Sequence, residues 1–409
     1  MASVLKPTDA AQVLEVLQWA VGHETALELA GAGGKRGFGR PLVLEHQLAL
    51  SALSGISLYE PDELVLTAGP GTTMREIEGL LSQHRQALAF EPPDLGPLYG
   101  ADAGLQTLGG VIACNLSGPR RIKAGAARDH VLGIKGVSGR GEAFKSGGRV
   151  VKNVTGYDLP KLLTGSFGTL AALTEITVKV LPAPEKTRTV MVYGLSIDGG
   201  VRALAQAASS PHEVAGLAHL PAPVARRCEV PYVGDAGQAV TAIRVEGPSP
   251  SVDHRCAELK ALLASSGAVE ELHSMNSGAF WREVRDVAGL LPDPGHALWR
   301  LSVTPSEAPA VLARLPEALR EEVYLDWAGG LIWLAVPEGD DGAAGEVRAA
   351  VQADGHATLL RASDDVRRAV PVFQPQPAPL AALSERVRRA FDPLHLLNPG
   401  RMYAVGAEG

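Results

Sequence analysis

The chain has 409 residues and a formal net charge of −7, and 46% of its residues are hydrophobic while 20% are charged. This composition is ordinary for a globular protein of two or three domains and excludes a wholly disordered chain. The acidic balance disfavours nucleic acid as a partner, and three cysteines without a CxxC pair are too few for an iron–sulfur cluster.

The first 85 residues predict alternating helices and strands. Apolar residues recur with a helical period after Thr8 and Asp9, either of which can cap the helix. A second helix is expected from the turn at 69–73 to His84. Short strands are predicted at 25–29, 42–44 and 63–67.

Residues 104–182 are rich in glycine and predict short strands, at 131–137 and 173–181, with few helices. The second of these alternates apolar and polar residues, as a half-buried strand does. Because prolines follow it, we expect a linker at 185–188 and a domain boundary there.

The rest of the chain predicts strands alternating with helices, without an evident internal repeat. Strands are expected at 190–193, 242–245, 298–303 and 331–336, and helices at 200–209, 252–263, 309–315 and 345–353. This spacing favours a small ferredoxin-like α+β sandwich. A proline-rich connector at 374–379 precedes a helix at 380–391 and a final turn at 392–403.

Two glycine clusters suggest sites where backbone N–H groups approach a diphosphate. A Rossmann loop is excluded, since Arg36 stands where the third glycine belongs and no helical period follows Gly37. A Walker A loop is excluded because Gly34-Lys35 is followed by Arg36 rather than Ser or Thr.

The remaining scheme uses two glycine loops without a helix, at 31–39 and 104–118, that close on the diphosphate from two sides. Tight turns without a ligand are the alternative for either cluster. Further donors and charges in or after the second loop are Thr107, Asn115, Ser117, Arg120, Arg121 and Lys123.

Several motifs now resemble a known family. Lys152-Asn-Val-Thr-Gly-Tyr-Asp158, Leu163-Thr-Gly-Ser-Phe-Gly-Thr-Leu170 and the strand ending at Pro182 resemble the p-cresol methylhydroxylase-type FAD domain of the vanillyl-alcohol oxidase superfamily. Leu116-Ser-Gly-Pro-Arg-Arg121, together with Val151-Lys-Asn-Val-Thr-Gly-Tyr-Asp158, resembles one branch, the FAD-binding E subunit of bacterial glycolate oxidase. Phe391-Asp-Pro-Leu-His-Leu-Leu-Asn-Pro-Gly-Arg-Met-Tyr403 is similar to the C-terminal signature of that family.

The resemblance implies an α+β fold class, with a bilobal p-cresol methylhydroxylase-type FAD-binding domain and a ferredoxin-like α+β cap domain. The expected domains are 1–184 for FAD binding, 185–379 for the cap, and 380–409 for a C-terminal segment that returns to the FAD domain.

The implied FAD contacts come mostly from the two glycine loops. The first loop has no His that could tether the flavin, so the cofactor is expected to be noncovalent. The expected contacts are Gly31, Ala32, Gly33, Gly34, Lys35, Arg36, Gly37, Phe38, Thr107, Leu108, Gly109, Gly110, Ala113, Gly118, Arg120, Thr155, Gly156, Gly165, Gly168 and Ile176.

No catalytic residue or metal ligand can be named. Relatives that oxidise 2-hydroxy acids carry a block H-x-G-D-G-N-x-H in the cap domain, and this chain has none. His212 and His219 have a comparable spacing without the Gly-Asp-Gly turn, while His356 and His395 stand alone. We therefore expect no metal, with His395 in the terminal motif as a candidate neighbour of the flavin.

The missing block favours a subunit that passes electrons within a glycolate oxidase complex, together with a catalytic flavoprotein subunit and an iron–sulfur subunit. A stand-alone FAD-dependent 2-hydroxy acid dehydrogenase and a flavin-free scaffold are the alternatives. Without a signal peptide or a span of about 18 apolar residues, the expected location is the cytoplasm, with membrane association only through partners.

Overall fold

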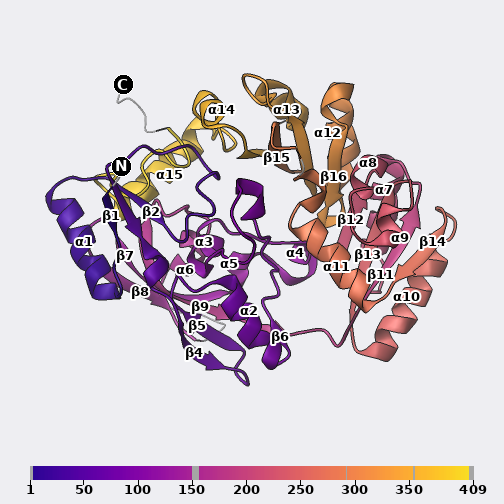
Figure 1. Ribbon diagram of the computed structural model, residues 1–409, viewed down its shortest axis with the longest axis horizontal. Coiled ribbons are helices and arrows are strands. Elements are labelled where there is room, and N and C mark those ends of the chain that lie inside the picture. Colours follow the sequence, from indigo (N-terminus) through magenta and orange to yellow (C-terminus); the bar gives the residue numbers. More distant parts are fainter. Residues whose placement is uncertain (1–2, 150–155, 292, 353–354, 405–409) are drawn as a thin grey trace. The chain divides into compact units, whose positions relative to one another are not determined.

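The computed structural model describes residues 3–149, 156–291, 293–352 and 355–404, and its chain forms two compact units (Figure 1). The first unit comprises Met1–Leu116, Ala126–Ala183 and Pro375–Gly409, and the second comprises Ser117–Gly125 and Pro184–Gln374. Residues 117–125 thus belong to the second unit, although they lie inside the FAD-binding domain expected from sequence. Among the described residues, no helix is long and apolar enough to cross a membrane.

A small parallel sheet opens the first unit, in the order β1 (Ser3–Leu5), β3 (His46–Ala49), β2 (Leu27–Ala30). Helix α1 (Ala10–Gly22) begins at Asp9, whose side chain accepts from the Gln12 N–H, and buries one apolar face. The first glycine cluster begins directly after β2.

A five-stranded sheet forms the rest of the first unit, in the order β4 (Ile56–Glu60), β5 (Val65–Ala68), β9 (Ala171–Lys179), β7 (Val131–Ser138), β8 (Ala143–Gly147). All its pairings are antiparallel. Around it lie α2 (Met74–Gln83), α3 (Leu108–Ala113), α5 (Ala127–His130), α6 (Leu159–Leu163) and the pair β6 (Gln86–Ala87) and β10 (Leu181–Pro182).

The C-terminal segment returns to the first unit at Pro375, just before α15 (Ala378–Phe391). The buried carboxylate of Asp392 accepts from the N–H groups of Leu396 and Leu397, which closes a tight turn. The chain then pairs with β2, because Leu27 donates to Leu396 and Asn398 donates to Leu27. The end of β2 is therefore held by residues almost 370 positions later in the sequence.

The second unit contains an eight-stranded antiparallel sheet, in the order β14-β11-β13-β12-β16-β17-β15-β18. Its first half runs β11 (Lys186–Tyr193), α7 (Ile197–Ala208), β12 (Gly216–Leu220), β13 (Val240–Gly247), α10 (Ser249–Leu263), β14 (Val269–Leu272). Its second half runs β15 (His296–Ser302), α12 (Ala308–Arg314), β16 (Glu322–Asp326), β17 (Leu331–Pro337), α13 (Ala344–Val351), β18 (His356–Arg361).

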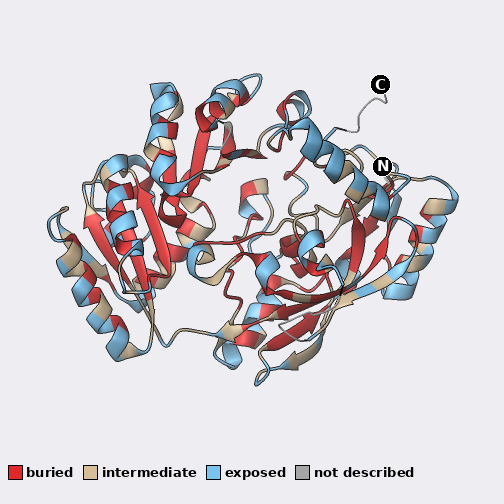
Figure 2. Ribbon diagram, turned by 180° about the vertical axis from the view of Figure 1, so that it is seen from behind, coloured by how far each residue is buried: buried red, intermediate tan, exposed pale blue. Residues whose placement is uncertain are grey.

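Each half is therefore a ferredoxin-like βαββαβ arrangement, and the two join where β12 pairs with β16. The repeat is structural only, since the sequence shows no repeated pattern. Shorter helices complete the unit: α4 (Arg121–Ala124), α8 (Ala222–Ala225), α9 (Pro231–Gly234), α11 (Ser274–Arg285) and α14 (Asp364–Ala369). In both units the strands are largely buried and the helices expose one face (Figure 2).

The mixed α and β content agrees with the predicted fold class, and most predicted elements are present. The predicted strand at 42–44 is wrong: Val43 is 86% exposed, and the strand that pairs with β1 and β2 is β3 instead. The predicted linker at 185–188 is also wrong, because Lys186 to Arg188 extend β11 along β13. In both places a partner strand that is distant in sequence decides the structure.

Candidate functional site

A pocket in the first unit is lined mainly by four segments: residues 28–38, 106–114, 167–173 and the C-terminal turn. Its empty volume is about 860 Å³, part of it open to solvent. The pocket is thus partly open, and each of its walls has a distinct chemistry.

The first wall is the glycine loop at 31–39, whose backbone presents donors. Arg36 donates to the Gly33 carbonyl and Phe38 to the Lys35 carbonyl, which turns the chain tightly, and Gly33 has a φ of +81°. Within the described residues, the N–H groups of Ala32, Gly33, Gly34 and Lys35 donate to no acceptor. Consecutive free N–H groups around a residue with positive φ form a concavity suited to an anion.

The glycines of this loop serve two purposes. A Cβ at Gly31 would lie 2.5 Å from the Thr107 hydroxyl oxygen, and one at Gly37 would lie 2.3 Å from the Tyr99 ring. Both glycines are thus required by packing within the protein. By contrast, a Cβ at Gly34 would have no atom closer than 3.9 Å, so this part of the loop faces open space.

The second wall differs from its prediction, because residues 104–118 are not a helix-free loop. Residues 108–113 form α3, with Thr107 as its N-cap. The N–H of Leu108 donates to Thr72, that of Gly109 to Pro70, and that of Gly110 to the Thr107 hydroxyl. These N–H groups are therefore occupied within the protein, and the second segment is a scaffold for the first loop rather than a second set of amide donors.

Lys35 connects the two walls. Its ammonium group lies 3.3 Å from the Gln106 side-chain oxygen, and a Cβ at Gly110 would lie 2.9 Å from its Cε atom. Burial lowers the pKa of Lys35, an effect opposed by the Cys114 thiol and by Asp94. Burial also raises the pKa of Cys114. The pocket wall therefore carries the Lys35 amine close to a thiol that burial favours in its neutral form.

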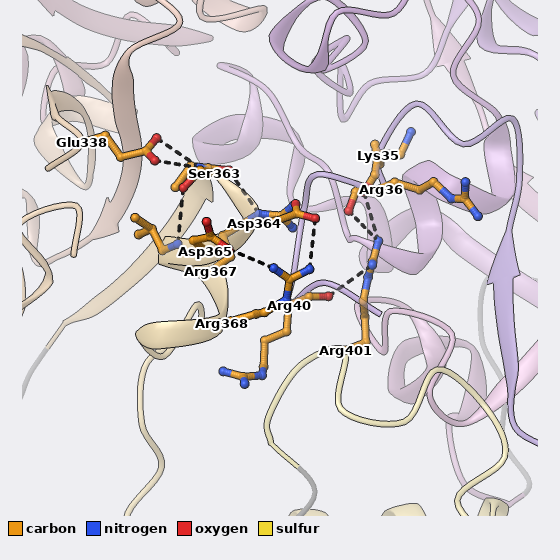
Figure 3. Close-up of polar contacts among 12 residues, drawn as sticks. Lys35, Arg36, Arg40, Glu338, Ser363, Asp364, Asp365, Arg367, Arg368 and Arg401 are labelled. Atoms are coloured by element: carbon orange, nitrogen blue, oxygen red, sulfur yellow. Dashed lines mark hydrogen bonds and ion pairs between the residues drawn. The ribbon is translucent and has the colours of Figure 1, made fainter. Parts of the chain in front are cut away.

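Arg401 holds the first loop from the C-terminal segment (Figure 3). Its guanidinium donates to the carbonyl oxygens of Lys35, Arg36 and Arg40 at 3.1–3.3 Å, and the Arg40 N–H donates back to the Arg401 carbonyl at 2.9 Å. Three loop carbonyls are thus engaged by one side chain that is 9% exposed. This fixes the backbone conformation that leaves the N–H groups of the loop free.

Asn398 fixes the opposite end of the pocket. Its side-chain oxygen accepts from the Leu29 N–H at 2.8 Å, and its nitrogen donates to the Phe167 carbonyl at 2.7 Å. The Phe167 ring meets Phe38 edge to face, with centroids 4.9 Å apart. One asparagine therefore ties the end of β2 to the loop that precedes β9.

The structure brings most of the predicted cofactor residues together at this pocket. The predicted residues that line it are Gly31, Ala32, Gly33, Gly34, Lys35, Arg36, Phe38, Thr107, Gly109, Gly110, Ala113 and Gly168.

Four other predicted residues lie behind the pocket wall. Gly37 packs against Tyr99, and Leu108, the first residue of α3, is fully buried. Gly165 donates its N–H to Ile112, and Ile176 is buried within β9. These residues shape the wall without lining it.

The remaining predicted residues lie elsewhere. Gly156 is exposed, and Thr155 lies outside the described residues. Gly118 and Arg120 belong to the second unit, where Gly118 accepts from the Trp327 indole and Arg120 donates two hydrogen bonds to Glu246. In that unit Arg120 has a structural partner of its own.

In the part of the chain that the structure describes, no three His, Cys, Asp or Glu side chains are grouped to hold a metal. His219 is fully buried within the sheet against Thr241, and burial lowers its pKa to about 4, so it is neutral. His395 does not line the pocket and instead contacts Arg388 of α15.

Sequence reasoning missed several pocket residues. Cys114 and Phe167 line the pocket and are adjacent to predicted residues, but no sequence motif indicated that they would contact a ligand. Asn398 and Arg401 did have a signal, because both lie in the Leu-Leu-Asn-Pro-Gly-Arg motif at the C-terminus. That motif indicated a relationship, and only the fold shows that it reaches the glycine loop.

Comparisons with known proteins agree with this geometry. Residues 1–147 match the family described as FAD binding domain. The chain is 37% identical to glycolate oxidase subunit GlcE of Escherichia coli (strain K12), over 98% of this chain and 99% of that protein. It is 28% identical to glycolate oxidase subunit GlcD of Bacillus subtilis (strain 168), over 65% of this chain and 56% of that protein.

Solved structures share the fold at low sequence identity. p-Cresol methylhydroxylase with substrate bound has a TM-score of 0.75 at 14% identity, covering 98% of this chain and 88% of that one. 4-Ethylphenol oxidase from Gulosibacter chungangensis has a TM-score of 0.73 at 14% identity, covering 98% and 89%. At this identity the likeness establishes the fold alone.

Proposed function

The chain belongs to the E-subunit family of glycolate oxidases, FAD-dependent oxidoreductases, and from this premise we propose that it is the FAD-binding flavoprotein subunit of a glycolate oxidase complex. In this role it takes part in electron transfer while glycolate is oxidised to glyoxylate. FAD, when bound, supplies the two-electron redox chemistry that no side chain can provide.

The observation that carries the proposal is the row of free N–H groups at 32–35 beside Lys35. A diphosphate is the part of FAD that needs such donors, and a lysine cation adds charge complementarity. Arg401 and Asn398 hold the pocket in shape from the C-terminal segment. The donor set therefore fits the diphosphate of the cofactor.

We expect the flavin to be held without a covalent bond. No histidine is present among the described residues that line the pocket. The Cys114 thiol does line it, but burial raises its pKa, and a neutral thiol is a poor nucleophile. Acid precipitation should release all the FAD into the supernatant, whereas flavin that stays with the pellet would contradict noncovalent binding.

The subunit is proposed to work with two partners. The described residues contain no group of three His, Cys, Asp or Glu side chains that could hold a metal ion, and the chain has three cysteines, too few for an iron–sulfur centre. A catalytic flavoprotein subunit would oxidise the acid, and an iron–sulfur subunit would pass electrons onward. We place the complex in the cytoplasm, with any contact to the membrane made through the partners.

Anaerobic reduction of the flavin tests this function. The purified chain should carry FAD that glycolate reduces only after the catalytic subunit is added. Reduction of the isolated chain by glycolate or D-lactate would instead support a stand-alone dehydrogenase, and a chain that never carries FAD would support a scaffold. Co-purification from the native host would identify the partner chains and their cofactors.

A further inference from the structure

The wall of the pocket in the first unit contains a carboxylate. Glu28 lies on β2, just before the glycine loop, and its side chain is 14% exposed. Among the described residues that line the pocket it is the only acidic one, and the other charged side chains there are Lys35, Arg36 and Arg401. Because a carboxylate repels a nearby anion, Glu28 is unexpected at a site for a diphosphate.

Arg36 is the partner of Glu28. Its Nε donates to Glu28 Oε1 at 3.0 Å, and its Nη2 donates to Glu28 Oε2. In the described part of the chain the guanidinium has no other acceptor, and the carboxylate accepts from no other residue. A guanidinium binds a phosphate group through the same two parallel hydrogen bonds. A carboxylate and a phosphate can therefore take the same place on Arg36.

The side chain of Arg36 passes beside the free N–H groups of the loop. Its Cδ atom lies 4.0 Å from the position that a Cβ at Gly33 would take, and Gly33 is one of the residues with a free N–H. Both backbone polar groups of Arg36 are engaged, since its N–H donates to Gly33 and its carbonyl accepts from Arg401. A change of partner by Arg36 therefore requires rotation of its side chain alone.

The ion pair between Glu28 and Arg36 is open to exchange. The Arg36 side chain is 51% exposed, and water screens and weakens an ion pair at such a position. A diphosphate held by the N–H groups at 32–35 carries more negative charge than the single carboxylate of Glu28 and is a strong acceptor for a guanidinium. Arg36 can therefore turn to the diphosphate, at the cost of leaving Glu28 without its donor.

We propose that Glu28 regulates the cofactor site by competing with the diphosphate of FAD for Arg36. The identity of the ligand rests on the proposed function. Since Arg36 can bind the diphosphate only by releasing the carboxylate, Glu28 holds the affinity for FAD below the value that the loop alone would give. Glu28 is thus a positioning residue that acts through Arg36 and keeps the cofactor exchangeable.

The test is isothermal titration of the full-length apo-protein with FAD. Glu28→Gln should lower the Kd about fivefold, because Arg36 is then available to the diphosphate, and damage to the fold cannot cause such a gain. In an Arg36→Gln background the same substitution should give a smaller gain, below about twofold, because no arginine is left to release. Glu60→Gln is the matched control, since it removes an exposed carboxylate from β4 outside the pocket and should leave the Kd unchanged.

Two results would overturn the inference. An unchanged or higher Kd in Glu28→Gln would show that the carboxylate does not limit FAD binding. An equal or larger gain in the Arg36→Gln background would show that Glu28 repels the ligand directly and does not act through Arg36. Thermal melting identifies a variant that does not fold, and Glu28→Ser or Arg36→Met, which remove the same charges, then take its place.

Titration with inorganic pyrophosphate separates this inference from the proposed function. If FAD binds to the unmodified chain and the variants do not follow the expected order, the inference alone is rejected. If FAD does not bind, the proposed function is rejected, and the Kd values for pyrophosphate in the same variants decide the inference by the same two results. Absence of pyrophosphate binding as well would reject both.

Discussion

The two glycine-rich segments of the first unit look alike in sequence but have different roles in the structure. The segment at 31–39 has free N–H groups at the pocket, while the N–H groups at 108–110 donate to neighbouring protein atoms. The first segment thus has N–H groups available to a ligand, whereas the N–H groups of the second are used within the protein. Glycine content therefore shows that backbones approach closely, but not what they approach.

Gly109→Val should have the largest effect, because it disrupts the supporting segment. A Cβ there would lie 2.7 Å from the Pro70 Cβ and 2.9 Å from its carbonyl oxygen, so backbone must move. We expect the free energy of unfolding to fall by about 2–3 kcal/mol and FAD to be lost with it. Chemical denaturation and absorbance at the flavin band measure both. Unchanged stability would show that the second segment is not a scaffold.

Gly110→Val, at the neighbouring position, should weaken FAD binding while leaving the fold intact. A Cβ here meets only the flexible end of Lys35 and the Thr107 hydroxyl, but it enters the pocket wall. The fold should remain while the Kd for FAD rises by roughly 100-fold, equivalent to about 2.7 kcal/mol. Isothermal titration of the apo-protein with FAD measures this change. Full FAD occupancy in the purified variant would contradict the proposal that FAD occupies the pocket that Gly110 lines.

Lys35 should make FAD affinity depend on pH. It is the side chain of the first segment that contacts the second. Its protonated form attracts a diphosphate, and burial lowers its pKa below the ordinary 10.5. The attraction is therefore present below the lowered pKa and is lost as the pH rises through it. FAD affinity should fall as the pH rises toward the ordinary value of 10.5, and Lys35→Met should lack this fall and bind FAD about tenfold more weakly on the low-pH side of it. An identical pH profile in both proteins would remove Lys35 from the site.

Arg401→Gln tests whether the free N–H groups depend on the C-terminal segment. Three loop carbonyls would lose their donor, which should raise the Kd for FAD roughly fivefold to tenfold and lower stability by about 1–2 kcal/mol. Arg389→Gln is the matched control, because Arg389 is 59% exposed and pairs only with Glu385 among the described residues. Equal FAD affinity in the two variants would show that the loop holds its conformation alone.

Gly34→Ala should have the smallest effect. Its Cβ would enter open space at an unstrained backbone position, so stability should be unchanged and the Kd for FAD should rise less than about threefold. Gly33→Ala is the matched comparison, because Gly33 has a φ of +81° and a side chain there costs about 1 kcal/mol. If the two variants melted at the same temperature, the described turn of the loop would be wrong.

Much of the local structure could be predicted from sequence. Helix α1 with its Asp9 cap and helix α2 after the 69–73 turn follow from periodicity and capping residues. Helix α3 could not be predicted, because Gly109 and Gly110 are poor helix formers and only contacts with Pro70 and Thr72 hold the turn.

The candidate site was predictable on one side only. The first glycine loop is recognisable in the sequence from its glycine content. Arg401 and Asn398, by contrast, contact Arg36 and Leu29, which lie more than 360 positions earlier in the sequence. The duplication within the second unit was equally hidden, since topology repeats there while the residues do not. Contacts between residues that are distant in sequence depend on tertiary packing, which local sequence patterns do not predict.

The discontinuity of the first unit has a consequence for biosynthesis. Residues 184–374 are inserted into this unit, and Asn398 and Arg401, which complete the pocket, follow the insertion. Since domains generally fold in the order in which they leave the ribosome, the inserted unit can fold before the pocket exists. FAD should therefore bind only after residue 401 has been synthesised. A nascent or prematurely terminated chain that lacks Asn398 and Arg401 should not acquire the yellow cofactor.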